Sequence, residues 1–409
     1  QTGIPARIGH QPEEVREGKV NTFVSEKCAG LSMSAIKKMA ILSAGVPGAA
    51  SLAWGLPSFR TPKSIRMAIK TALEQDPTAG MYTLPAGLPE LLEACAAEFE
   101  TRFGRRVDPE RNIVISAGNM EAMNTLLNAV VDPGDEIVVT DPGFVSHIQQ
   151  IAKCQGIPVF WPMDEENGWE LDGEVLPGLI GPKTKAIILV NPSNPTGSLF
   201  SERTLRATAE IARKNGLLVI IDDPYGQFVY GDGSEVTNLA ALTEYAENVA
   251  YMYTFSKAHA MSGWRAGYMI VPESIRNDVV KIHDLNMICT PRISQIAALA
   301  ALQGDQAHVK EFRTTLDRRR SLICERLDRL AHVFSYARPD GTYYVFPRVL
   351  VGQDTSEEFA RQLLFETKVA VTPGNAFGPS GENHVRMAFC VDSDTINLCF
   401  DRLEQRFGH

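Results

Sequence analysis

The stretch Val249-Ala250-Tyr251-Met252-Tyr253-Thr254-Phe255-Ser256-Lys257 decides the fold. Its apolar, partly aromatic first half predicts a β-strand, and the lysine stands just beyond the strand. The glycine-rich segment Gly263-Trp264-Arg265-Ala266-Gly267-Tyr268 follows. An amine placed there suits Schiff-base formation with an aldehyde, and Thr254, Ser256 and Arg265 can gather around a phosphate. An isolated lysine is more often a solvated surface charge, so the interpretation depends on the other strands.

Composition limits the class of protein. The chain has 409 residues, of which 44% are hydrophobic and 22% charged, and this predicts a soluble globular protein of two domains. The formal net charge of -9 argues against a nucleic-acid or acidic-membrane partner. No apolar run approaches the length of a membrane span. The basic run Arg318-Arg319-Arg320 lies in a helical pattern and predicts a solvated helix face.

The cysteines and the first residues indicate the compartment. Seven cysteines are scattered without C-x-x-C spacing, which is typical of reduced thiols and predicts neither a disulfide framework nor a metal site. Pro5, Pro12 and several charges stand where a signal peptide would need an apolar core. A cytoplasmic location is therefore expected.

Strand and helix patterns alternate through the middle of the chain. Helical patterns at 121–131, 145–154 and 202–214 separate apolar segments that predict seven strands, at 112–116, 136–140, 158–162, 185–190, 217–221, 250–255 and 265–271. Continuous apolar strands between helices predict an α/β fold, with a mainly parallel seven-stranded sheet flanked by helices. The loop before the last strand is too short for a crossover helix, so this strand is expected to run antiparallel to its neighbours.

Both chain ends predict a smaller α+β domain. A loose arm and a helix at 34–44 precede the sheet, and a long helix at 306–330 leads to strands near 343–346, 370–372 and 384–389. The expected division is 1–58 for the arm and part of the small domain, 59–303 for the large domain, and 304–409 for the rest of the small domain.

Polar or aromatic residues follow five of the strands. Ligands of open α/β sheets collect at the carboxyl ends of the strands, so these residues are expected to meet. Each has an ordinary structural explanation alone, such as turn formation or core packing. Together they describe a socket for a charged heteroaromatic aldehyde phosphate. In strand order they are Gly118-Asn119-Met120, Phe144, Asn194, Asp222 with Tyr225, and Lys257.

The order of these motifs resembles the fold-type I pyridoxal-phosphate (PLP) enzymes, specifically the class I/II aminotransferases of the aspartate aminotransferase superfamily. The resemblance covers nearly the whole chain. It is carried by Gly55-Leu56-Pro57, Tyr82 with Gly87, Gly118, Asn194-Pro195-Thr196-Gly197, Asp222 with Tyr225, Ser256-Lys257, Gly263-Trp264-Arg265, Pro373-Gly374-Asn375-Ala376-Phe377-Gly378 and His384-Val385-Arg386.

The resemblance implies roles around the cofactor ring. Lys257 would form the Schiff base and shuttle the proton, and Asp222 would pair with the ring nitrogen. Asn194 and Tyr225 would reach the ring hydroxyl oxygen, and Phe144 would stack on the ring. His147 would either hydrogen-bond Asp222 from behind or be a core histidine on a helix face.

The resemblance also implies the phosphate and substrate contacts. The phosphate would take Gly118, Asn119, Met120, Thr254, Ser256, Arg265 and, from the neighbouring subunit of a homodimer, Tyr82. Many relatives carry serine and glutamine where Asn119 and Met120 stand, so only backbone contacts are expected from these two. Arg386 would clamp the substrate α-carboxylate in bidentate fashion, with Gly55 and Asn194 beside it.

These features predict an aminotransferase that moves an amino group between an L-amino acid and a 2-oxo acid by a ping-pong mechanism. A lyase, decarboxylase or cyclising synthase could use the same cofactor residues. An effector-sensing domain of a transcription regulator is a third class, but no basic helix-turn-helix segment precedes Gly55.

The substrate side is less clearly indicated. No arginine occurs in 284–290, where a dicarboxylate enzyme would carry one, so a strict aspartate enzyme is not supported. Arg292 is expected to be structural, although it could reach the neighbouring chain's substrate. Trp54, Leu56 and Met287 would suit an aromatic or branched donor.

Overall fold

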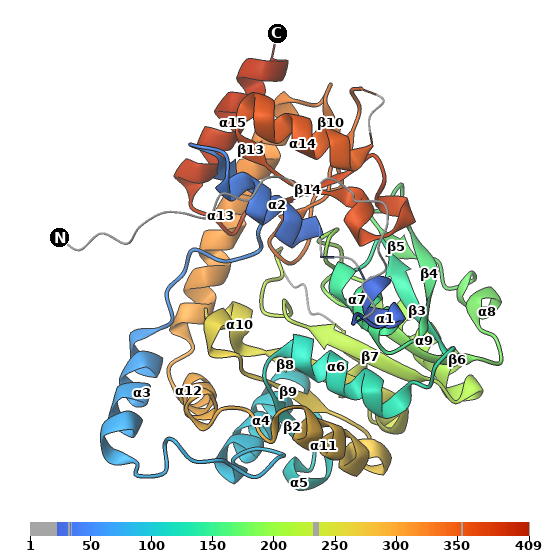
Figure 1. Ribbon diagram of the computed structural model, residues 1–409, viewed down its shortest axis with the longest axis vertical. Coiled ribbons are helices and arrows are strands. Elements are labelled where there is room, and N and C mark those ends of the chain that lie inside the picture. Colours follow the sequence, from blue (N-terminus) through green and yellow to red (C-terminus); the bar gives the residue numbers. More distant parts are fainter. Residues whose placement is uncertain (1–22, 32, 34, 232–236, 353–354, 409) are drawn as a thin grey trace.

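The computed structural model describes residues 23–31, 33, 35–231, 237–352 and 355–408 (Figure 1). The predicted arm over 1–22, and Ser34 at the start of the first predicted helix, lie outside the described residues.

An eight-stranded sheet forms the centre of the molecule. Its strand order is β2-β9-β8-β7-β6-β3-β4-β5, and β9 is antiparallel to both of its neighbours. The mainly parallel sheet and the antiparallel strand are thus confirmed. The eighth strand, β5, is only two residues long and pairs antiparallel with β4, so it carries no sequence pattern of its own. The strands are β2 (Ile113–Ser116), β3 (Glu136–Asp141), β4 (Ile157–Asp164), β5 (Glu170–Leu171), β6 (Thr184–Val190), β7 (Leu218–Asp223), β8 (Val249–Thr254) and β9 (Gly267–Ile270).

Helices cover both faces of this sheet, as the continuous apolar strands predict. In β6, Ile187 and Leu189 enter the core on one face, while Ala186 and Ile188 enter the core on the other. The first face packs mainly against α3 (Lys63–Gln75), α4 (Pro89–Phe103), α9 (Glu202–Asn215) and α12 (Arg292–Gln303), and the second against α6 (Asn119–Val130), α7 (Val145–Lys153) and α11 (Glu273–Met287). The short helix α1 (Glu26–Ala29) precedes these elements in the chain, and α5 (Pro109–Asn112) and α8 (Leu176–Leu179) lie between them.

A separate hydrophobic core joins the two ends of the chain. It takes Met39 from α2 (Ala35–Ala44) together with residues of the last hundred positions. The strand β1 pairs parallel with β13, where Ala50 faces Val369. The other elements are α13 (Ala307–Arg329), α14 (Ser356–Thr367), α15 (Ser393–Phe407), β1 (Ala50–Ser51), β10 (Phe334–Ser335), β11 (Tyr344–Val345), β12 (Arg348–Val349), β13 (Val369–Ala370), β14 (Thr372–Pro373) and β15 (Val385–Ala388). The division at residues 58 and 303 stays a prediction.

Two local predictions differ from the structure. The strand predicted over 250–255 ends at Thr254, and Lys257 lies in a single helical turn, α10 (Phe255–Ala258), rather than in a loop. The Thr254 hydroxyl caps this turn by accepting a hydrogen bond from the backbone N–H of Ser256 at 3.2 Å. Arg319 does not lie on a solvated face, because it is 9% exposed and donates to the Cys390 carbonyl at 2.9 Å. None of the helices in the described residues is both long and apolar enough to cross a membrane.

Candidate active site

A cavity of about 310 Å³ lies at the carboxyl ends of β7 and β8, with α6 and α7 beginning at its wall and β15 completing it. Most predicted site residues line it: Gly55, Asn119, Met120, Phe144, Asp222, Tyr225, Thr254, Ser256, Lys257, Arg265 and Arg386. The wall also contains Ile36, Lys37, Trp54, Ser146, His147, Pro224, Ser262 and Tyr344. Of the predicted residues, Gly118, Asn194 and Tyr82 do not line the cavity.

Lys257 lies half-buried in the cavity wall. Its Nζ donates to the backbone carbonyl of Gly55 at 3.1 Å and lies 5.8 Å from the centre of the Tyr343 ring. Burial lowers the pKa of the Lys257 amine to about 8, with Arg386 and Arg265 acting in the same direction. A larger share of this amine is therefore neutral, and able to attack a carbonyl, than for an ordinary lysine near neutral pH.

Asp222 and Asp223 end strand β7 and face opposite sides, as consecutive strand residues must. The Asp222 carboxylate accepts a hydrogen bond from the Asn119 side-chain amide at 2.5 Å, and its other oxygen lies 3.0 Å from His147 Nε2. The predicted His147–Asp222 contact is thus confirmed. Asp222 is 3% exposed, and none of the described residues supplies it with a lysine or arginine partner. Its buried charge is therefore suited to a cationic ring nitrogen.

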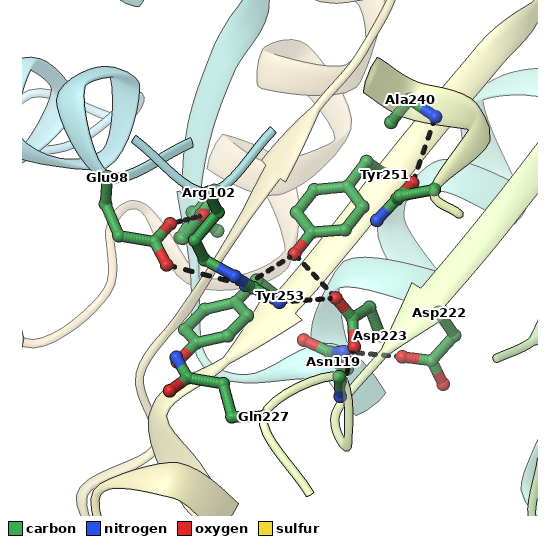
Figure 2. A network of polar contacts seen from close by, with 12 residues as sticks. Glu98, Arg102, Asn119, Asp222, Asp223, Gln227, Ala240, Tyr251 and Tyr253 are labelled. Carbon is green, nitrogen blue, oxygen red and sulfur yellow. Dashed lines mark hydrogen bonds and ion pairs between the residues drawn. The ribbon is translucent and has the colours of Figure 1, made fainter. Parts of the chain in front are cut away.

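Asp223 belongs to a buried polar network on the other side of β7 (Figure 2). Its carboxylate accepts from Arg102 Nη2 at 3.1 Å and from the Tyr251 hydroxyl at 2.9 Å. Arg102 also lies 3.4 Å from Glu98, whose pKa is raised by burial. Arg102 is thus the cationic partner of Asp223. No local motif predicts this pair, because the two residues are 121 positions apart.

Arg386 is a buried cation without a carboxylate. Its side chain is 1% exposed, with Nη1 donating to Asn194 Oδ1 at 3.0 Å and Nη2 to the Ala53 carbonyl at 2.8 Å. Its Nε has no partner, and no acidic side chain in the described part of the chain pairs with it. Asn194 thus fixes the Arg386 guanidinium, and the Asn194 side-chain nitrogen lies 3.5 Å from the Tyr225 hydroxyl. The free charge suits a substrate carboxylate.

The start of α6 and Arg265 form the anion-binding end of the site. Gly118 has φ +81°, a backbone conformation in which any other residue would be strained, and a Cβ there would also lie 2.8 Å from Arg265 Nη2. The Arg265 guanidinium is fixed by bonds to the carbonyls of Ser262 and Ala117, both at 2.8 Å. The Thr254 and Ser256 hydroxyls, 2.8 Å apart, face the same cavity. Free N–H groups at a helix start beside an arginine suit a phosphate.

Two tyrosines that no sequence motif indicated lie at the cavity: Tyr344 lines it, and Tyr343 contacts the lining residue Gly55. The Gly55 carbonyl accepts from the Tyr343 hydroxyl at 3.1 Å, and a Cβ on Gly55 would overlap the Tyr344 hydroxyl. The Tyr344 ring lies 4.2 Å from the Arg386 guanidinium, and its hydroxyl lies 3.3 Å from that of Tyr225. In the sequence, Tyr343 and Tyr344 look like ordinary strand residues of the small domain.

The residues predicted to face the substrate are less closely grouped. Trp54 lines the cavity, whereas Leu56 and Met287 do not. Tyr82 is 74% exposed and lies away from the cavity of its own chain. Arg292 lies 3.7 Å from Asp76, which agrees with the structural role expected for it.

Comparisons with known proteins agree with this geometry. The profile of the family described as aminotransferase class I and II matches residues 49–403. An aspartate aminotransferase of Pyrococcus abyssi is 34% identical over 384 residues, covering 93% of this chain and 97% of that protein. An aromatic-amino-acid aminotransferase of Thermococcus litoralis is 33% identical over the same coverage of both chains. The solved structure of a Thermus thermophilus aspartate aminotransferase mutant gives a TM-score of 0.87 at 28% identity, covering 93% and 99% of the two chains. The chain is therefore a member of the class I and II aminotransferases.

Proposed function

We propose that this aminotransferase binds PLP in the 310 Å³ cavity and moves an amino group from an L-amino acid to a 2-oxo acid by a ping-pong mechanism. One observation carries the proposal. The half-buried Lys257 amine, the Asp222 carboxylate without a lysine or arginine partner and the Arg386 cation without a carboxylate all face one cavity. Each of these groups lacks, within the described residues, the partner that the cofactor or the substrate would supply. The family itself uses PLP.

The residues of the cavity suit both the ring and the phosphate of the cofactor. PLP, when bound, supplies an aldehyde for the lysine and an aromatic ring that accepts the electron pair left when the substrate loses its α-proton. Asp222, held by Asn119 and His147, keeps a negative charge where the ring nitrogen would lie. Arg265, Ser256 and the first N–H groups of α6 would hold the phosphate. Phe144 would cover one ring face, and Tyr225 would reach the ring hydroxyl oxygen, with the Asn194 amide 3.5 Å from its hydroxyl.

The remaining residues act on the amino acid. Arg386 orients the substrate by its α-carboxylate, with Asn194 fixing the guanidinium. Lys257 Nζ would take the proton from the substrate Cα and deliver it on the cofactor side, so that the amino group stays with the cofactor while water supplies the oxygen of the oxo acid. We propose an aromatic or aliphatic donor, supported by Trp54 in the cavity wall.

We also propose a homodimer with shared active sites. The exposed Tyr82 ring, outside the cavity of its own chain, supports its reaching the phosphate in the partner's site. A sedimentation experiment tests this, because a monomer with full activity would exclude it. The seven free cysteine thiols support a cytoplasmic location.

The two half-reactions test the proposed function. Purified protein loaded with PLP is mixed with single amino acids, and the visible absorbance of the bound cofactor is followed. We expect it to be lost with an aromatic or aliphatic L-amino acid and restored by a 2-oxo acid. Loss without restoration, with ammonia or carbon dioxide released, would instead show lyase or decarboxylase chemistry.

The lowered pKa of Lys257 predicts how cofactor capture depends on pH. The rate at which apo-protein captures PLP should rise about fivefold between pH 7 and pH 8, since the neutral fraction of an amine with a pKa of about 8 rises by that factor. Stability follows the same group. Between pH 8 and the ordinary value of 10.5 the unfolded chain holds more protons than the folded one, so the free energy of unfolding should rise with pH. Stopped-flow absorbance and urea titrations measure the two effects, and a flat capture rate would contradict the first.

A further inference from the structure

We propose that Glu121 is a positioning residue for the cofactor phosphate, acting through the backbone of the turn that precedes α6. The inference rests on the proposed function, because it concerns the phosphate end of the same cavity. Glu121 and its partner His283 do not line that cavity, and neither residue belongs to a motif of the resemblance. Glu121 can therefore act on the phosphate only through the turn that it contacts.

The phosphate end depends on backbone atoms of this turn more than on its side chains. Gly118, the N-cap of α6, has no side chain that could cap the helix or bind an anion. The Asn119 amide donates to Asp222 at 2.5 Å, and the Met120 side chain is apolar. The first N–H groups of a helix have no acceptor within the helix, so they are the donors that a phosphate would use. A small shift of the turn would misplace several of these donors at once.

Glu121 reaches back to the turn. It is the third residue of α6, and its Oε2 accepts a hydrogen bond from the Ala117 N–H at 3.2 Å. The Ala117 carbonyl accepts from Arg265 Nη2 at 2.8 Å, so both polar backbone groups of Ala117 are held. The Gln150 side chain donates to the Met120 carbonyl at 2.6 Å and fixes the other end of the turn. The turn is thus attached at three points, and Glu121 supplies one of them.

Glu121 is itself fixed by a buried histidine of α11. Its Oε1 lies 2.9 Å from His283 Nδ1 and accepts from the Thr125 hydroxyl at 2.5 Å. His283 is 0% exposed, and its Nε2 has no partner among the described residues. Buried polar groups are normally hydrogen-bonded, and the bond to Glu121 is the one that accounts for an imidazole at this place. The carboxylate therefore has a fixed position between α11 and the turn.

An acidic residue in the first turn of a helix also stabilises the helix, because its charge interacts favourably with the helix dipole. That effect requires only a charge near the helix start. It requires neither the bond to the Ala117 N–H nor a fully buried imidazole. The two explanations predict different results with pyridoxal, which is the same aldehyde without the phosphate. A role in stability alone would change the binding of PLP and of pyridoxal equally.

The experiment measures the affinity of the full-length protein for PLP and for pyridoxal by absorbance titration. Glu121→Ala should lower the ratio of the PLP affinity to the pyridoxal affinity about tenfold, because the charge-assisted bonds from the turn to the phosphate are weakened. Glu121→Gln should keep the ratio within about threefold of the wild type, since its amide oxygen can still accept from the Ala117 N–H. His283→Ala should lower the ratio by about threefold, because Ala117 and Thr125 still hold Glu121.

Glu136→Ala is the matched control. Glu136 is a partly buried glutamate that accepts from the Thr184 hydroxyl at 3.3 Å, at the amino end of β3, and it does not line the cavity. This variant should leave the ratio unchanged. The phosphorus NMR signal of PLP in the loaded enzyme gives a second readout that needs no turnover. It should move in Glu121→Ala and stay in place in Glu136→Ala.

An unchanged ratio in Glu121→Ala, or an equal loss of both affinities, would overturn the role of Glu121 and leave the proposed function intact. If Glu121→Ala does not fold, an unchanged ratio in His283→Ala would overturn it in the same way. A wild type that binds no PLP would overturn the proposed function itself, and this inference with it.

Discussion

Replacing Lys257 by alanine is expected to lower the transamination rate at least about 10³-fold, because in the proposed function one side chain supplies both the nucleophilic amine and the proton transfer at the substrate Cα. Borohydride should fix a cofactor adduct on this peptide in the wild type, and the variant should lack it. Steady-state kinetics and peptide mass measurement check the two results. A variant that kept either the adduct on another lysine or a rate within tenfold of the wild type would contradict the assignment.

The same variant is not expected to unfold the protein. Burial disfavours the charged form of Lys257, as its pKa of about 8 shows, so its removal below that pH relieves a cost rather than breaking an ion pair. Thermal unfolding of the apo-protein should therefore occur at an equal or higher temperature. Lys281→Ala, which removes an exposed lysine that bonds Asp278, serves as the control for both activity and stability.

Asp222→Asn is expected to lower activity by about 10³-fold, because in the proposed function Asp222 stabilises a positive charge on the PLP ring nitrogen and a neutral amide cannot. The contacts to Asn119 and His147 involve neutral or titratable partners, so the free energy of unfolding should change by only about 1 kcal/mol. The rate of the first half-reaction and a urea titration measure the two quantities. A loss of stability that accounted for the whole loss of activity would contradict the proposed role of Asp222 at the ring nitrogen.

Asp223→Asn changes the neighbouring aspartate, and the expected result is the reverse: a loss of stability with little loss of activity. It leaves the buried Arg102 with Glu98 as its remaining carboxylate, at 3.4 Å, so the free energy of unfolding should fall by about 3 kcal/mol. Activity per folded molecule should stay within a few-fold of the wild type, because Asp223 does not line the cavity. The two variants change the same chemical group at consecutive positions of β7. Similar changes in activity and in the free energy of unfolding for both variants would contradict the separate roles of Asp222 and Asp223.

The sheet and the strand-end residues could be predicted because both depend on local patterns. Continuous apolar runs separated by helices require a covered parallel sheet, and such a sheet places its strand ends together. For that reason Phe144, Asp222, Tyr225 and Lys257, named from separate segments, line one cavity. Gly118 was predicted to lie in a glycine turn, and its φ of +81° in the structure explains why a glycine stands there.

Pairings between distant side chains could not be predicted, because no local pattern encodes them. The bond of Arg102 to Asp223 depends on how α4 packs against the sheet, and the burial of Arg319 depends on a carbonyl 71 positions away. The place of α2 in the cavity wall likewise depends on distant contacts, because Met39 is buried among residues of the C-terminal region.

The pairing of β1 with β13 has a consequence for synthesis in the cell. Ala50 pairs with Val369, and Arg386 follows later still, so the residues proposed to hold the substrate are synthesised before and after the central sheet. The central sheet contains all its strands by residue 270 and can form while translation continues. A nascent chain released before β15 would have the lysine and the phosphate-binding end but no guanidinium for the α-carboxylate. Under the proposed function, such a truncated product should bind PLP but should not bind amino acids.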